Sequence, residues 1–166
     1  YHLHAERYPR RRIRRMRGAF RWKVDETSYF LPKNKVNVET ISLFFIALLF
    51  GGMCLYSFGF AAFVFTSLPS ELAGQTIRRA FPHFYIFVLL TSTISAVLVF
   101  FRDPYAAAVL GVVALVTLPI RQILMPAINQ ATDEGKKRLF AVLHGLSVAI
   151  TLMQIAATAY VLARFV

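Results

Sequence analysis

The 166-residue sequence has few charged residues: Asp, Glu, Lys and Arg together make up 16% of it, where a soluble domain carries roughly a quarter. It has a single cysteine, Cys54, so an internal disulfide is impossible and a disulfide-stabilised secreted scaffold is excluded. Hydrophobic residues make up 57% of the chain, and 16 residues are Phe. This balance excludes a soluble globule and a disordered chain, and it predicts an integral membrane protein.

The sequence also lacks the motifs of common catalytic and cofactor sites. It contains no CxxCH for covalent haem, no HExxH and no His/Cys cluster for zinc. It contains no P-loop, no GxGxxG and no GxSxG. No Asp or Glu lies near the centre of a long apolar run, which argues against a carboxylate proton path. We therefore expect no catalytic residue, no metal site and a protein that is not an enzyme.

Four long apolar runs occupy most of the chain. Each has about the ~20 residues needed to cross a ~30 Å hydrocarbon layer as a helix, and the backbone in lipid must satisfy its own hydrogen bonds. The runs cover residues of about 38–65, 83–101, 105–128 and 139–163. The predicted connections are short (67–82, 102–104 and 129–138), so sequential helices are expected to be antiparallel neighbours. The predicted fold class is all-α: an integral membrane antiparallel four-helix bundle over residues 38–166, preceded by a basic N-terminal arm over 1–37.

Positive charge is concentrated in this arm. Residues 1–35 hold eleven Lys and Arg against three acids, which gives +8 of the net +11. Ile13, Met16, Phe20 and Val24 share one helical face, which is typical of a basic amphipathic helix on a membrane surface. We expect the arm to bind anionic lipids or neighbouring subunits, with a solvated tail as an equal alternative, and we do not expect nucleic acid as its partner. The residues predicted to make these contacts are Arg10, Arg11, Arg12, Arg14, Arg15, Arg17, Arg21 and Lys23.

The distribution of Lys and Arg also predicts the orientation of the chain in the membrane. Side A of the membrane, the side of the arm, carries the bases of the arm together with Arg102 and Arg164. Side B carries Arg78, Arg79 and the three bases at 136–138. The positive-inside rule places side A in the cytoplasm or the mitochondrial matrix. Because the arm is Arg-rich and acid-poor like a mitochondrial targeting segment, we expect the mitochondrial inner membrane with a matrix N-terminus. A bacterial inner membrane with a cytoplasmic N-terminus is the alternative.

Small residues recur at four-residue spacing in every run, a pattern that lets helices pack closely in lipid. The pairs are Ala47 and Gly51, Ser57 and Ala61, Ser92 and Ala96, Ala107 and Gly111, and Gly145 and Ala149. They predict a tight bundle. The first run is rich in Phe and is expected to face lipid or a neighbouring subunit.

Polar side chains inside the runs are the candidate functional residues, because burying them in lipid is costly. Arg121, late in the third run, and His144, early in the fourth, are expected at the depth of His83 and Asn129. The fourth run also has a polar stripe at helical spacing, predicted to face the bundle interior or another protein; it comprises His144, Ser147, Thr151, Gln154 and Thr158. Hydrogen bonds to the local backbone, and an Arg121 that reaches the side B surface, are the structural alternative. The predicted polar cluster, structural or ligand-binding, is His83, Arg121, Asn129, His144, Ser147 and Gln154.

These residues also carry a family resemblance. The matching elements are a Leu-Pro and a Gly in the first loop, Phe-Pro-x-x-Tyr, an Arg and a Pro late in the third run, an Asp in the last loop, and Phe-x-x-x-His-Gly-x-Ser. They are Leu68, Pro69, Gly74, Phe81, Pro82, Tyr85, Arg121, Pro126, Asp133, Phe140, His144, Gly145 and Ser147. Over residues 42–163 the chain resembles the transmembrane protein 205-like domain, although Thr151 stands where that family often has Asn. The resemblance implies a four-helix membrane fold and no specific activity.

Three functions are compatible with this sequence. The first is a non-catalytic accessory subunit of a larger inner-membrane energy-converting complex, a respiratory complex or ATP synthase, with no cofactor and with other subunits as partners. The second is a redox protein that binds quinone or haem b, with His83 and His144 as axial ligands and Arg121 near a propionate. The third is a small stand-alone transporter or stress protein that uses the polar stripe.

Overall fold

A computed structural model describes residues 37–165 of the chain. The predicted lipid- or partner-binding arm, from Arg10 to Lys23, lies outside the described residues. The elements in chain order are α1 (Val38–Cys54), the π-helix η2 (Leu55–Phe60), α2 (Ala61–Ser67), α3 (Ser70–Val99), α4 (Pro104–Pro119), the π-helix η3 (Ile120–Leu124), α5 (Met125–Asp133) and α6 (Lys137–Ala163).

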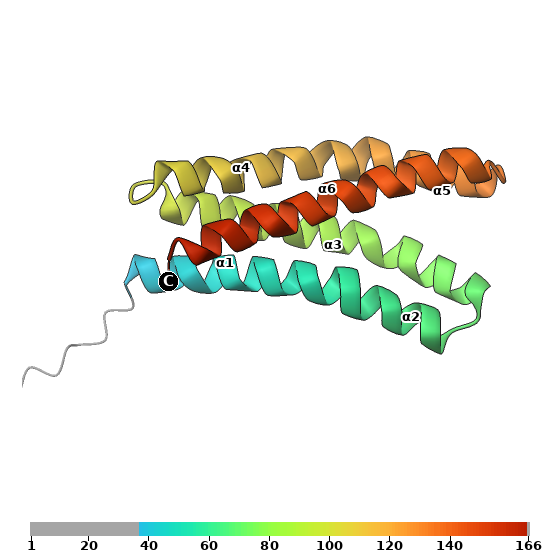
Figure 1. Ribbon diagram of the computed structural model, residues 1–166, viewed down its shortest axis with the longest axis horizontal. Helices are drawn as coiled ribbons and strands as arrows, with labels where there is room; N and C mark the ends of the chain where they lie inside the picture. Colours follow the sequence, from blue (N-terminus) through green and yellow to red (C-terminus); the bar gives the residue numbers. More distant parts are fainter. Residues whose placement is uncertain (1–36, 166) are drawn as a thin grey trace, which may run out of the picture. The chain divides into compact units, whose positions relative to one another are not determined.

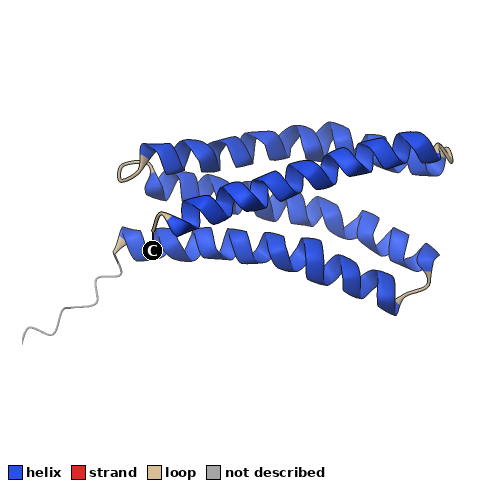
Figure 2. Ribbon diagram, viewed as in Figure 1, coloured by secondary structure: helices blue, strands red, loops and turns tan. Residues whose placement is uncertain are grey.

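These elements join into four long helices, and the described residues contain no strand (Figure 2). The helices, called the first to fourth spans below, are Val38–Ser67, Ser70–Val99, Pro104–Asp133 and Lys137–Ala163, and each is long and apolar enough to cross a membrane. The first span packs on the second and fourth, and the third span also packs on the second and fourth (Figure 1). The prediction of an all-α four-helix membrane bundle is confirmed.

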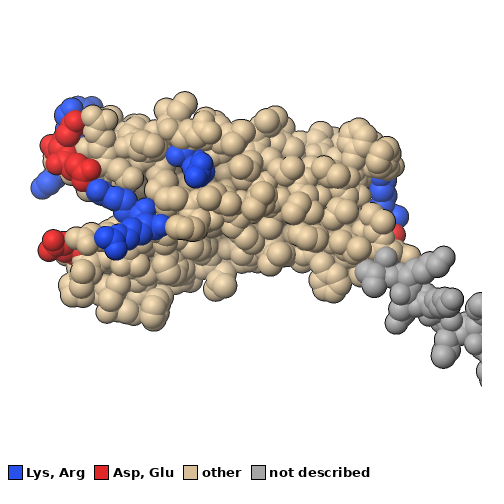
Figure 3. All heavy atoms as spheres, turned by 180° about the vertical axis from the view of Figure 1, so that it is seen from behind, with Lys and Arg blue, Asp and Glu red and all other residues tan. Residues whose placement is uncertain are grey.

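The core lies between the four spans and is mainly apolar, with some buried Ser, Thr and Gln side chains. Its fully buried side chains include Ile46, Leu49, Met53, Val88, Val99, Leu110 and Val161. Large apolar side chains are also exposed on all four spans, and on the face that Figure 3 draws, Lys, Arg, Asp and Glu lie mainly at the two ends of the bundle. Because the outer face of a soluble bundle would be polar, this surface is that of a helical bundle solvated by lipid.

The boundaries of the second span differ from the prediction. Residues 67–82 are not a connection, because only Leu68 and Pro69 separate the first two spans and α3 begins at Ser70. The segment after Pro69 is rich in good helix formers, and these outweigh the single Gly74. Pro82 lies inside the helix, where it removes one backbone donor but does not end the helix in its packed setting.

The third span is also longer than predicted. It continues through η3 and α5 to Asp133, so Asn129 is a helical residue and not the start of a loop. The turn into the fourth span is short and contains Gly135 at φ +65°. This left-handed conformation is one that glycine adopts without a steric cost, and it closes the end of α5.

Side A, the end at which the first span begins, is tied together by charge. Arg102 contacts the carboxylate of Glu39 at 2.7 Å, and Arg164 contacts that of Asp103 at 2.7 Å. Asp103 also caps α4 by accepting a hydrogen bond from the backbone N–H of Ala106 at 3.0 Å. The cap hydrogen bond and the bond from Arg164 lower the pKa of the Asp103 carboxyl. These contacts join the first, third and fourth spans at one end of the bundle.

Two glycines of the predicted small-residue pairs make no close helix contact, whereas Ser92 and Ala107 of other pairs are buried. Gly51 and Gly145 are exposed, and a Cβ added at either would meet nothing within 4 Å. The close approach is made instead by Gly52, where an added Cβ would lie 2.5 Å from Cζ of Phe87. The first span therefore presents Gly52, and not Gly51, to the second span.

Candidate functional site

The third span changes its winding where the sequence places Arg121 between two prolines. Ile120–Leu124 is a π-helix, in which the backbone N–H of Met125 donates to the carbonyl of Ile120. Pro126 has no N–H, so the carbonyl of Gln122 has no donor at the usual i+4 position. A wide turn accommodates this gap, and π-turns inside α-helices occur frequently at functional sites.

An open groove of about 780 Å³ lies along this part of the third span, toward side B. Its lining residues from residue 121 onward lie on one face of the helix, because they are adjacent pairs that recur every four positions. The lining comprises Pro82 from α3 together with Arg121, Gln122, Met125, Pro126, Asn129, Gln130, Asp133 and Glu134. The groove combines a cation at one end, two carboxylates at the other, and amides and apolar side chains, and its Arg121 end suits the negative group of an amphipathic ligand.

Arg121 is the cation at the inner end of this groove. Its side chain is half-buried, and its Nε is buried without a hydrogen-bond partner among the described residues. A buried guanidinium nitrogen without a partner is costly, because the nitrogen has lost its water and gained nothing in return. Arg121 is therefore the strongest candidate in the described chain for binding something that the bundle itself does not provide.

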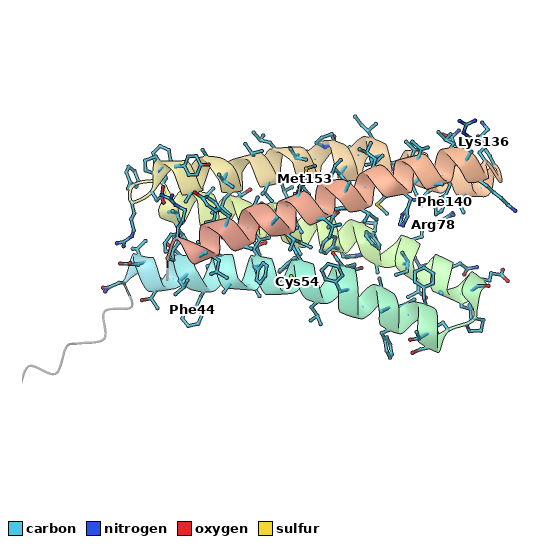
Figure 4. The ribbon with its side chains drawn as sticks, viewed as in Figure 1. Phe44, Cys54, Arg78, Lys136, Phe140 and Met153 are labelled. Atoms are coloured by element: carbon cyan, nitrogen blue, oxygen red, sulfur yellow. The ribbon has the colours of Figure 1, made fainter. Side chains whose placement is uncertain are left out.

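The carboxylates at the outer end of the groove are paired. Asp133 contacts Arg78 of α3 at 2.8 Å, and Glu134 contacts Lys136 at 2.7 Å. Gln130 also donates to Glu134 at 2.8 Å. The hydrogen bond from Lys136, followed by that from Gln130, lowers the pKa of the Glu134 carboxyl. Arg78 and Lys136 lie at the same end of the bundle, opposite the end near Phe44 (Figure 4).

The polar stripe of the fourth span faces the bundle interior along most of its length. Ser147, Gln154 and Thr158 are buried. Nε2 of Gln154 donates to Oγ1 of Thr117 at 3.1 Å and to the carbonyl of Val113 at 3.2 Å. Ser147 contacts the hydroxyl of Tyr85 on the second span at 3.4 Å. These contacts connect spans, and they give the Gln154 amide and the Tyr85 hydroxyl partners inside the bundle.

The two histidines differ from the rest of the predicted cluster. His83 is exposed, and its Nδ1 lies 3.2 Å from the carbonyl of Arg79 on its own helix. His144 is exposed and stacks on the ring of Phe140, with ring centroids 5.4 Å apart. Neither lines the groove, which contains Arg121 and Asn129. Haem b or quinone binding at these histidines, and transport through the polar stripe, stay predictions.

Two features of this region were not predicted. Gln122 and Gln130 line the groove. Gln122 lies four residues before Pro126, and Gln130 lies four residues before Glu134, so all four share one helical face. The prediction placed Gln122 in a span and Gln130 in the connection that follows it. An aromatic cluster also joins the first and second spans, in which Tyr56 stacks on Phe84 at a centroid distance of 4.5 Å. The hydroxyl of Tyr56 is buried with no hydrogen-bond partner among the described residues. No spacing rule in the sequence pairs residues so far apart.

Comparison with protein families gives one match. The family profile described as a domain of unknown function, DUF4149, matches residues 44–137, which is more than half of the chain. The chain belongs to the DUF4149 family. The matched region contains the whole lining of the groove, from Pro82 to Glu134, whereas the fourth span after Lys137, including Gln154, lies beyond it. Searches of curated proteins and of solved structures find no significant match.

Membership of the DUF4149 family agrees with an uncharacterised membrane domain. The resemblance to the transmembrane protein 205-like domain is compatible with this match and stays a prediction. Neither family description carries an activity, so the function has to be argued from the contacts of this DUF4149 protein itself.

Proposed function

We propose that this DUF4149 protein is a non-catalytic accessory subunit of a larger energy-converting membrane complex. The main support is the distribution of its exposed aromatic residues. Four of the six exposed phenylalanines in the described chain lie on the first span: Phe44, Phe58, Phe63 and Phe65, with exposed fractions from 56% to 70%. Aromatic side chains provide a large, rigid contact area and are enriched at protein interfaces. In this proposal the first span packs against a neighbouring subunit.

The interior of the bundle supports a structural role. Gln154 uses its amide to join the fourth span to the third, and Thr158 donates to the carbonyl of Gln154 at 2.8 Å. Thr117 donates to the carbonyl of Val113 at 2.7 Å. All these groups have partners within the bundle: the amide of Gln154 bridges two spans, and the two threonine hydroxyls bond within their own helices. A rigid bundle with one aromatic face is what a subunit that fills a gap in an assembly requires.

The proposed location is the mitochondrial inner membrane, in a respiratory complex or ATP synthase, with the N-terminus in the matrix. The support is the composition of residues 1–35, with eleven Lys and Arg against three acids, which is typical of mitochondrial targeting segments and of positively charged inner faces. The alternative is a bacterial inner membrane with a cytoplasmic N-terminus. Protease accessibility of an N-terminal tag in mitoplasts or spheroplasts distinguishes the two sides of the membrane.

Native electrophoresis after mild solubilisation tests the assembly. We expect the tagged protein to migrate within a complex far larger than its own 18.8 kDa, together with co-purifying membrane subunits. Migration as a free monomer across several mild detergents would refute the proposal.

Photo-cross-linking tests the face. A benzoylphenylalanine at Phe63 on the first span, 65% exposed, is compared with one at Leu115 on the third span, 66% exposed. Equal exposure makes Leu115 a matched control for access to the probe. We expect a discrete protein adduct from position 63 and no such adduct from position 115. Identical products from the two positions would contradict the proposed interface.

A further inference from the structure

We propose that the groove around Arg121 binds one anionic phospholipid, with the phosphodiester against the Arg121 guanidinium. The site goes beyond the accessory-subunit role, because it depends only on the third span and Pro82. The proposed ligand has a single negative phosphodiester, an uncharged hydroxyl-bearing headgroup and two acyl chains.

The first argument is the missing counter-charge. The described residues contain five carboxylates, at Glu39, Glu71, Asp103, Asp133 and Glu134. Four of these form ion pairs with Arg102, Arg164, Arg78 and Lys136. Nε of Arg121 is buried and unpartnered among the described residues. A cation at membrane depth requires an anion or a hydrogen-bond acceptor, and a phosphate presents oxygens that a guanidinium binds in a two-pronged geometry.

The second argument is depth. At 1.5 Å per residue, Arg121 lies about 26 Å along the helix from Pro104, where the charged turn of side A ends. It lies about 18 Å from Asp133 on side B. A hydrocarbon layer of about 30 Å that begins near Pro104 ends within one helical turn beyond Arg121. Arg121 therefore lies close to the level of lipid phosphates on side B.

The third argument is the polarity on either side of Arg121. Toward side B the groove is lined by the amides of Gln122, Asn129 and Gln130, which can hydrogen-bond the hydroxyls of a headgroup. Toward side A the third span exposes Val112 and Leu115, at 57% and 66%, which suits acyl chains. The order of polar groups, cation and apolar surface matches that of a phospholipid in the side B leaflet.

The outer end of the groove selects the headgroup charge. Asp133 and Glu134 are each balanced by one cation at 2.8 Å and 2.7 Å, so they provide no spare positive charge. Each ion pair has no net charge, so a headgroup with a second negative charge gains no attraction from them. A neutral polyol headgroup meets only hydrogen-bonding partners. Phosphatidylglycerol has this chemistry and serves as the probe.

Lipid binding to the purified full chain tests the site. Native mass spectrometry measures retention of phosphatidylglycerol against phosphatidylcholine of equal acyl chains. We expect about fivefold tighter binding of phosphatidylglycerol, the preference that one base near anionic lipid provides. Arg121→Gln should abolish this preference, and Arg121→Lys should retain most of it. Arg79→Gln, an exposed arginine of side B outside the groove, should leave it unchanged.

Each other outcome overturns the proposal. Equal binding of the two lipids by the wild type would do so even if a variant failed to fold, because that comparison needs no substitution. Wild-type selectivity in a folded Arg121→Gln variant, checked by circular dichroism, would place the site elsewhere. Displacement of phosphatidylglycerol by an equal concentration of inorganic phosphate would identify a free-anion site and not a lipid site.

Discussion

Replacing Gly52 by alanine tests the closest approach between the first and second spans. The added Cβ would lie 2.5 Å from Cζ and 2.6 Å from Cε1 of Phe87. Favourable carbon–carbon contacts lie at about 3.5–4.0 Å, so the ring or the helix has to move by about 1 Å. Phe87 is only half-buried, so its ring can yield in part. We therefore expect the clash itself to cost about 1 kcal/mol, the low end of the range for overpacking, relative to a glycine-to-alanine change that meets no neighbour.

Gly51→Ala is a matched control for this substitution. It lies at the adjacent position of the same helix, and its Cβ would meet nothing within 4 Å. Alanine gains about 0.5–1 kcal/mol of helix propensity over glycine at either position, so the difference between the two variants isolates the contact with Phe87. The assay is unfolding by SDS in dodecyl maltoside micelles, followed by circular dichroism at 222 nm.

The result that would refute this reasoning is a Gly52→Ala variant as stable as Gly51→Ala to within about 0.5 kcal/mol, the usual scatter of neutral surface substitutions. A third variant adds a further check. In a Phe87→Leu background the ring atoms that clash are absent, so the difference between the two alanine variants should shrink. If that difference persists, the cost comes from some other contact of Gly52.

Three further predictions concern polar contacts and the last turn. A double-mutant cycle of Gln154→Leu with Thr117→Val should give a coupling free energy of about 0.6 kcal/mol, and at most about 1.7 kcal/mol, as for other hydrogen bonds between membrane helices. Zero coupling in SDS unfolding would contradict the contact. The folded-state pKa of Asp103 is lowered, so its contribution to stability is present above the ordinary carboxyl pKa of 3.8 and is lost as the pH falls through the lowered value. Unfolding midpoints measured from pH 6 to about pH 2 should therefore fall more steeply for the wild type than for Asp103→Asn, and parallel curves would argue against the ion pair. Gly135→Ala should destabilise the protein by about 1–2 kcal/mol, because φ is +65° and a Cβ is strained there. The control Gly145→Ala should not destabilise it. Equal unfolding midpoints for the two variants would contradict the turn geometry.

The four spans were predictable because the bilayer imposes a simple requirement. A run of about 20 apolar residues satisfies it wherever it occurs, so hydropathy locates the spans without knowledge of their partners. The ends were harder, because helices that continue beyond the hydrocarbon have the polar composition of loops. The segment from Ser70 to Pro82 was therefore predicted as a connection, although it forms the first part of α3.

The candidate site was predictable in part for the same reason. Arg121 was identified because a cation within an apolar run is costly wherever its helix is placed. His83 and His144 were grouped with it by expected depth, but depth does not tell which way a side chain points. Both are exposed and lie outside the groove lining. Gln122 and Gln130 were missed because the helix that aligns them with Arg121 was predicted to end between them.

The sequence by itself determined that this is a four-span membrane protein and that Arg121 is its most unusual intramembrane residue, because the cost of placing a group in hydrocarbon depends on that group alone. The tertiary structure decided which glycine contacts Phe87, which polar residues share the groove and which are satisfied inside the bundle. These contacts depend on the rotation of each helix about its own axis. Packing against neighbouring helices sets that rotation, so no single segment of the sequence specifies it.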